Sequence, residues 1–201
     1  MISKTFPITE IIRNRRTVKP AMMDPDLEIP IELVDELLEN ANWAPTHGFT
    51  EPWRFVIFSE GYRKVLGEKL QELYSKHTPD DQFRQDKIDK LGKNPILAPI
   101  VMAICMKRGD NPKIPELEEI EAVACAVQNM HLTAAAAGLG AFWSSPPILD
   151  TEGMREFLSL RESDRCLGLF YIGLLKEGEN WPKSSRGPIS DKISWFGKSA
   201  E

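Results

Sequence analysis

Arginine and threonine side chains in two segments of the chain suit an anionic group. Arg15 and Arg16 are followed directly by Thr17, and Arg186 lies in a segment with glycine and proline near the C-terminus. Guanidinium groups pair bidentately with phosphate oxygens, and a hydroxyl adds a further hydrogen bond. The two segments therefore predict a phosphate site. A simpler interpretation also stands, in which Arg15 and Arg16 cap the C-terminus of a helix and stay solvated.

Two further segments can meet a planar ligand. His47 lies in a loop bounded by Pro45 and Pro52, and these prolines restrict its backbone. Trp143 follows a Gly-Leu-Gly turn and precedes two serines, Ser144 and Ser145. Small residues let a backbone approach a ligand closely, and hydroxyls can bond to the edge of a heterocycle. Each segment also reads as an ordinary connection between a helix and a strand.

Motifs of hydrolases and metal enzymes are missing from the sequence. It contains no G-x-S-x-G, no H-E-x-x-H and no P-loop. The three histidines, His47, His77 and His131, do not have metal-ligand spacing. We therefore expect neither a hydrolase nor a metal site. His131 is expected to face a core or an interface, and His77 to be solvated.

The composition is that of one globular domain spanning residues 1–201. The chain has 42% apolar and 27% charged residues, and a net charge of −5 disfavours general nucleic-acid binding. Polar residues interrupt the most apolar stretch, 122–143, so we expect no membrane span. The three cysteines are expected to pack as small apolar residues, and their sparse, odd number is typical of a cytoplasmic protein.

The elements that position these residues follow from prolines, glycines and apolar spacing. Pro7 and Pro30 begin two short helices, and a long alanine-rich helix over 116–137 ends at Gly138. Strands are predicted over 53–58, 96–106, 141–143 and 166–175. Two amphipathic helices between 60 and 93 form a surface excursion or a lid. Because helices and strands do not alternate strictly, we predict one mixed α/β or α+β domain.

The C-terminal tail, residues 175–201, shows neither a helical nor a strand period. It nevertheless carries five large apolar residues: Trp181, Ile189, Ile193, Trp195 and Phe196. Such residues need a surface to cover them, on the same domain or on a second copy. We favour the second copy, which predicts a homodimer.

Taken in chain order, these segments resemble the nitroreductase family of flavoproteins. The motifs that carry the resemblance span the chain: Arg15-Arg16-Thr17, Ala44-Pro45-Thr46-His47, Glu51-Pro52-Trp53-Arg54-Phe55, Gly138-Leu139-Gly140, Trp143, and Ser184-Ser185-Arg186-Gly187-Pro188. A histidine at position 47 is similar to the compact, short-chain subgroup. Two positions depart from the family pattern, because Phe49 stands where many members have Asn and Glu51 where they have Gln.

The resemblance implies an α+β homodimer with a mostly antiparallel central sheet flanked by helices. Two FMN molecules would lie at the subunit interface, and each tail would extend onto the partner subunit. The residues that would contact FMN are Arg15, Arg16, Thr17, Trp43, His47, Trp143, Ser144, Ser145 and Arg186. Those that would meet the nicotinamide nucleotide are Thr133, Ala134, Ala135, Ala136, Ala137 and Gly138.

The activity implied is reduction of nitroaromatics, quinones or related small-molecule acceptors by NADH or NADPH. Hydride would pass through the flavin N5 in a ping-pong reaction, so no catalytic residue is assigned. Three alternatives remain open. The first is a specialised member of the fold, such as a dehalogenase or a flavin-consuming enzyme. The second is a flavin-binding protein without activity, and the third is a dimeric scaffold without a cofactor.

Overall fold

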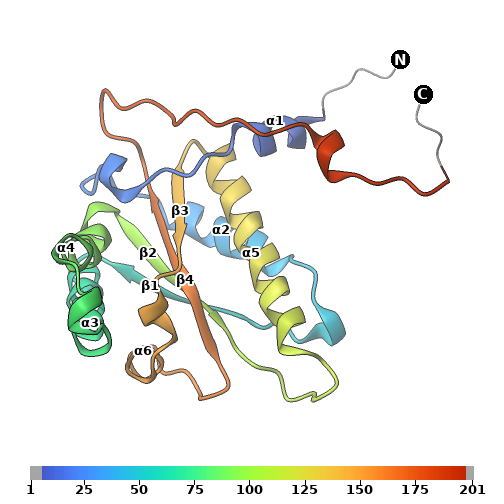
Figure 1. Ribbon diagram of the computed structural model, residues 1–201. Coiled ribbons are helices and arrows are strands. Elements are labelled where there is room, and N and C mark those ends of the chain that lie inside the picture. Colours follow the sequence, from blue (N-terminus) through green and yellow to red (C-terminus); the bar gives the residue numbers. More distant parts are fainter. Residues whose placement is uncertain (1–5, 198–201) are drawn as a thin grey trace.

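The computed structural model describes residues 6–197 and has a central sheet with helices on both faces (Figure 1). In chain order the elements are α1 (Pro7–Asn14), α2 (Ile31–Asn42), β1 (Trp53–Ser59), α3 (Tyr62–His77), α4 (Gln85–Lys93), β2 (Ile100–Met106), α5 (Glu116–Ala136), β3 (Gly140–Ser144), α6 (Glu152–Phe157) and β4 (Arg165–Gly173). The prediction of an α+β fold is confirmed.

The sheet has the order β1-β2-β4-β3, and every neighbouring pair of strands is antiparallel. Strand β2 is buried along its whole length because it lies between two other strands. The apolar sequence 53–58 predicts a buried strand, but β1 lies at an edge of the sheet and only Phe58 in it is buried. Strand β2 begins at Ile100, four residues later than expected, because Asn94–Leu97 forms a 3-10 turn.

Alternate strand residues face two different helical layers. On one face Met102 and Phe170 pack with residues of α2 and α5. On the other face Val101 and Tyr171 pack with residues of α3 and α6, and α4 packs against α3. Segment 60–93, considered above as a lid, therefore forms a packing layer on the face opposite α5.

Helix α5 crosses the sheet with a buried stripe that includes Val127, Met130 and Ala134. It ends where Gly138 adopts a φ of 75°, as the C-cap prediction requires. Cys125 lies on the exposed side of α5, so the expectation of burial is wrong for this cysteine, whereas Cys105 and Cys166 are buried. In residues 6–197 no helix is long and apolar enough to cross a membrane.

The C-terminal tail leaves the sheet after β4 and extends past α1 as an arm (Figure 1). Its base is fixed by a bridge between Leu175 and Met23. Farther along, Trp181 and Ile189 are exposed, and Phe196 is fully exposed. Apart from a 3-10 turn at Ile189–Lys192, the described part of the tail is irregular, as predicted. Its docking on a second copy stays a prediction.

Candidate functional site

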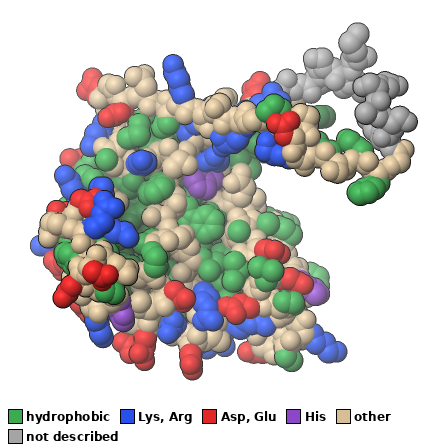
Figure 2. Space-filling view, viewed as in Figure 1, with side chains coloured by type: hydrophobic (Ala, Val, Ile, Leu, Met, Phe, Trp, Pro, Cys, Tyr) green, Lys and Arg blue, Asp and Glu red, His purple; other side chains and the backbone are tan. Residues whose placement is uncertain are grey.

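Arginines from the two ends of the chain line one cavity of about 340 Å³. Its walls come from the end of α1, from α5 and from the tail: Ile12, Arg13, Arg15, Arg16, Gln128, Ser184, Ser185 and Arg186. We call this cavity the arginine cleft. Lys and Arg side chains gather where the tail passes α1 (Figure 2). The structure thus brings together the two segments that predicted a phosphate site.

Positive charges lie close together in the arginine cleft. Burial lowers the pKa of Arg15, and the nearby charges of Arg186 and Arg16 lower it further. Such a cluster of like charges is stabilised when an anion lies among its members. Arg16 also donates from Nη1 to the carbonyl oxygens of Arg13 at 2.5 Å and Arg15 at 3.0 Å. The capping interpretation therefore holds for Arg16 alongside its place in the cleft.

Strand β3 runs next to the segment that follows the arginine cleft. Thr17 forms a parallel bridge with Ala141, two residues before Trp143. Trp143 is half-buried, and its buried Nε1 makes no hydrogen bond within the described chain. Ser145 donates from Oγ to the Leu167 carbonyl at 2.7 Å. The Thr17–Ala141 bridge therefore joins the segment that carries the cleft arginines to β3, the strand that leads into Trp143, Ser144 and Ser145.

His131 is a second buried residue with an unpaired nitrogen. Its ring meets the ring of Phe170 edge-on, with centroids 4.7 Å apart, and Phe170 is the β4 partner of Trp143. Among residues 6–197, Nδ1 of His131 has no hydrogen-bond partner. Burial, and secondly the charge of Arg15, lower the pKa of His131 to about 4. His131 is therefore neutral near pH 7.

Sequence reasoning placed His131 in a core or interface, which is confirmed, but did not place it near Arg15. The available signal was helical spacing, since position 131 follows the buried Val127 by four residues and precedes Ala134 by three. Spacing cannot show that the segment after α1 approaches the same part of α5. That contact arises from tertiary folding.

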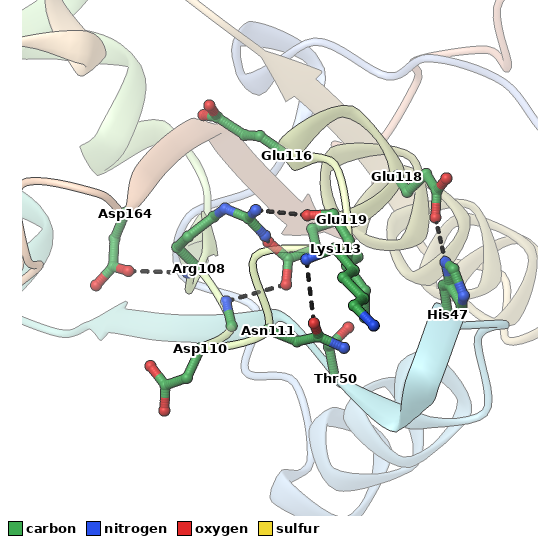
Figure 3. A network of polar contacts seen from close by, with 12 residues as sticks. His47, Thr50, Arg108, Asp110, Asn111, Lys113, Glu116, Glu118, Glu119 and Asp164 are labelled. Atoms are coloured by element: carbon green, nitrogen blue, oxygen red, sulfur yellow. Dashed lines mark hydrogen bonds and ion pairs between the residues drawn. The ribbon is translucent and has the colours of Figure 1, made fainter.

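The His47 loop contacts the opposite end of α5. Nδ1 of His47 lies 2.5 Å from Oε2 of Glu118, which is in the first turn of α5 (Figure 3). Gln128, at the arginine cleft, is ten residues farther along the helix, a separation of about 15 Å at 1.5 Å per residue. The structure therefore does not bring His47 and the arginine cleft together within one chain.

Beside this loop lies a buried ion pair between Arg108 and Glu119 (Figure 3). Oε1 of Glu119 accepts from the Gly109 backbone at 3.0 Å, and Nη2 of Arg108 donates to the Ile114 carbonyl at 2.5 Å. Asp164 accepts from the Arg108 backbone at 2.9 Å. This network, which sequence reasoning missed, fixes the loop between β2 and α5.

Trp43 lies at the end of α2, with its side chain mostly exposed. Its Nε1 donates to Oε1 of Glu39 at 2.9 Å. Together with Thr133 and Asn129 it lines an open cavity of about 330 Å³ between α1, α2 and α5. Trp43 therefore lies nearer the centre of α5 than His47 does.

The six residues expected to meet a nicotinamide nucleotide point in different directions around α5. Ala134 is buried in the core, and Thr133 is hydrogen-bonded to Asn40. Ala136 and Ala137 are exposed. The remaining two help to line a cavity of about 640 Å³, whose walls are Asn14, Arg16, Ala135, Gly138, Trp181, Pro182, Lys183 and Ser184.

Comparison with known proteins agrees with these features. A model of the nitroreductase family matches residues 12–174. YdjA of Escherichia coli K12, provisionally named an NAD(P)H nitroreductase, is 29% identical over 142 residues, which cover 71% of this chain and 75% of YdjA.

Two solved structures share the fold. A nitroreductase-like family protein from Bacillus cereus matches with a TM-score of 0.78 and 24% identity, over 98% of this chain and all of that one. A nitroreductase with bound FMN from Bacteroides fragilis matches with a TM-score of 0.73 and 21% identity, over 96% of this chain and all of that one. With its family model covering most of its length, the chain belongs to the nitroreductase family.

Proposed function

We propose that the protein is an FMN-dependent oxidoreductase that uses NADH or NADPH to reduce a nitroaromatic, a quinone or a related acceptor. The observation that carries the proposal is the arginine cleft, in which Arg15 and Arg16 meet Arg186 from the tail. Membership of the nitroreductase family and the FMN in the Bacteroides fragilis protein support the same cofactor.

The residues around the arginine cleft fit FMN. Arg15, Arg16 and Arg186 are suited to its phosphate, since guanidinium groups bind phosphate oxygens bidentately. The His131 ring meets Phe170 edge-on, and Trp143 is the β3 partner of Phe170. Within residues 6–197, Nδ1 of His131 and Nε1 of Trp143 have no hydrogen-bond partner, so both are candidates to contact the heterocycle or the ribityl chain. A buried polar atom without a partner is costly, so a ligand that supplies one is stabilised there.

The nicotinamide nucleotide is assigned to the cavity of about 640 Å³ next to the arginine cleft. Trp181 offers an aromatic face to a base, and Lys183 and Arg16 offer positive charge to the phosphates. Of the six residues first expected there, Ala135 and Gly138 are the ones that line this cavity.

When bound, FMN would supply the redox chemistry, which is hydride transfer between the nucleotide and the acceptor. The chain itself binds the phosphate through arginines and presents small residues, such as Gly138, where a nucleotide can approach the backbone. Neither task needs a nucleophile, which agrees with a sequence that lacks hydrolytic motifs.

A second copy of the chain completes the proposed site. His47 lies about 15 Å along α5 from the arginine cleft, so His47 of one subunit would face the cleft of the other. The exposed apolar residues of the tail, including Ile189 and Ile193, supply surface for such a dimer. A specialised member of the fold would need a lid over the site, and segment 60–93 does not supply one, because α3 packs on the sheet face opposite α5.

Titration with FMN tests the phosphate assignment. Arg186→Ala should raise the FMN dissociation constant about 10- to 100-fold, because a hydrogen bond to a charged group contributes about 1.5–3 kcal/mol. Arg186→Lys should recover part of the affinity through its charge. The quenching of free flavin fluorescence measures each constant.

Lys64→Ala is the control, since it removes one exposed positive charge of α3 outside the arginine cleft. It should bind FMN within about twofold of the wild-type protein, because an exposed charge contributes little. Equal affinities for wild type, Arg186→Ala and Lys64→Ala would reject the phosphate assignment.

A further inference from the structure

The pairing of His47 with Glu118 has a geometry suited to proton transfer. Glu118 lies against Nδ1, and no described residue bonds to Nε2. The side chain of His47 is 62% exposed, so Nε2 is open to an approaching molecule. An exposed ion pair contributes little to stability, so stability alone does not account for this arrangement.

The loop that carries His47 is held in a fixed and strained conformation. Gly48, Phe49 and Glu51 have positive φ angles of 59°, 56° and 43°. The hydroxyls of Thr46 and Thr50 are 3.0 Å apart, and the Glu51 backbone donates to Thr46 Oγ1 at 3.2 Å. Positive φ in residues other than glycine persists only where surrounding contacts impose it, and such strain concentrates at functional sites.

Glu118 is next to a member of the buried network in the sequence of α5. Glu119, the next residue of α5, is only 1% exposed and pairs with Arg108, whereas Glu118 points to His47 (Figure 3). The segment that Arg108 fixes also supports the loop, because a Cβ added to Gly48 would lie 2.9 Å from Ile114 Cδ1. Both His47 and Glu118 are therefore positioned by the segment that joins β2 to α5.

We propose that His47 donates the proton that accompanies acceptor reduction, and that Glu118 is its positioning residue. This inference rests on the proposed function. Reduction of a quinone by hydride adds two electrons and one hydrogen, and the oxyanion formed takes a proton to give the hydroquinone. The proton comes from Nε2 of His47. Solvent then returns a proton to Nε2 of the exposed ring. The Glu118 carboxylate accepts a hydrogen bond from Nδ1–H and so orients the His47 ring.

The two half-reactions of the FMN-loaded protein separate this role from cofactor binding. Glu118→Gln should slow the oxidation of the NADPH-reduced protein by a benzoquinone about 10- to 100-fold. Its FMN affinity and its reduction by NADPH should stay within about twofold of wild type, because neither step uses this proton. Stopped-flow absorbance measures both rates under nitrogen.

Glu116→Gln provides the matched control. Glu116 lies in the same turn of α5 and pairs with Nε of Arg165 at 3.0 Å, away from His47 (Figure 3). This variant should leave both half-reactions unchanged. His47→Ala should slow the quinone step and lose its solvent deuterium isotope effect, and added imidazole should restore part of the rate.

Three outcomes would overturn the inference. Equal quinone rates in Glu118→Gln, Glu116→Gln and wild type would exclude a role for Glu118, and absence of imidazole rescue would exclude proton donation by His47. In both cases the flavin would still be reduced by NADPH, so the proposed function would stand. A protein that binds no FMN, or whose bound FMN is not reduced by NADPH, would overturn both this inference and the proposed function.

Discussion

His131 lies on the sheet side of α5, and its Nδ1 has no hydrogen-bond partner in the described part of the chain. The ring is close enough to Arg15 for that charge to affect its pKa. Burial is the larger cause of its lowered pKa of about 4, and Arg15 is the second. Both favour the neutral ring. The neutral ring can offer a hydrogen bond to a bound ligand without adding another positive charge beside the arginine cleft.

This shift predicts how stability depends on pH. In the unfolded chain the side chain of His131 binds a proton near pH 6.5, whereas in the folded protein it binds one only near pH 4. Stability should therefore rise with pH through this window, and about 3 kcal/mol should be lost on acidification from pH 6.5 to 4. His131→Gln should flatten the change. Urea unfolding of the FMN-free protein at several pH values measures it.

The exposed His77 is the control for this experiment. His77→Gln should keep the pH dependence of the wild-type protein. If wild type and His131→Gln lose stability equally between pH 6.5 and 4, His131 is not held neutral in the folded state.

At the residue scale, the sequence predicted where the arginines gather but not what the carboxylates contact. Arg15, Arg16 and Arg186 do meet in one cavity, although the last two lie 170 positions apart in the chain. Glu118 and Glu119 are adjacent and chemically identical, yet one points to His47 and the other is buried against Arg108. Only the folded path of the segment before α5 distinguishes them.

At the element scale, local signals placed helix ends well and strand environments less well. Pro7 and Pro30 adjoin the starts of α1 and α2, and Gly138 ends α5, because these residues restrict or permit particular backbone angles. The burial of β1 depends on its place at the edge of the sheet, which the apolar sequence 53–58 does not encode.

The tail is the element with the most direct test. A chain ending at Glu179 keeps the Leu175–Met23 bridge but loses Arg186 and the exposed residues Trp181 and Ile189. We expect it to fold, to elute as a monomer in size-exclusion chromatography, and to bind FMN at least 10-fold more weakly. The full chain should elute as a dimer.

An Ile189→Asp variant separates the two effects of truncation, since it retains Arg186 but introduces a charge into the apolar surface of the tail. It should weaken the dimer more than a substitution at the exposed Lys64 of α3 does. A truncated chain that elutes with the same oligomeric state as the full chain would show that the tail does not hold two copies together.

At the scale of the whole molecule, the chain forms a three-layer α+β structure, with α2 and α5 on one face of the sheet and α3 and α6 on the other. The arginine cleft, the adjoining cavity of about 640 Å³ and the tail all adjoin α1 and α5. The His47 loop lies at the other end of α5. A pair of such chains could place one subunit's His47 beside the partner's arginine cleft, which gives the proposed enzyme two equivalent sites.

The visible absorption spectrum of the purified protein with added FMN, recorded under nitrogen before and after NADPH, tests the central claim most directly. We predict flavin bands that remain with the protein through gel filtration, bleach with NADPH or NADH, and return when a quinone or nitroaromatic is added. Bound flavin that neither nucleotide bleaches would indicate a flavin-binding protein without this activity. A protein that retains no FMN would contradict the account.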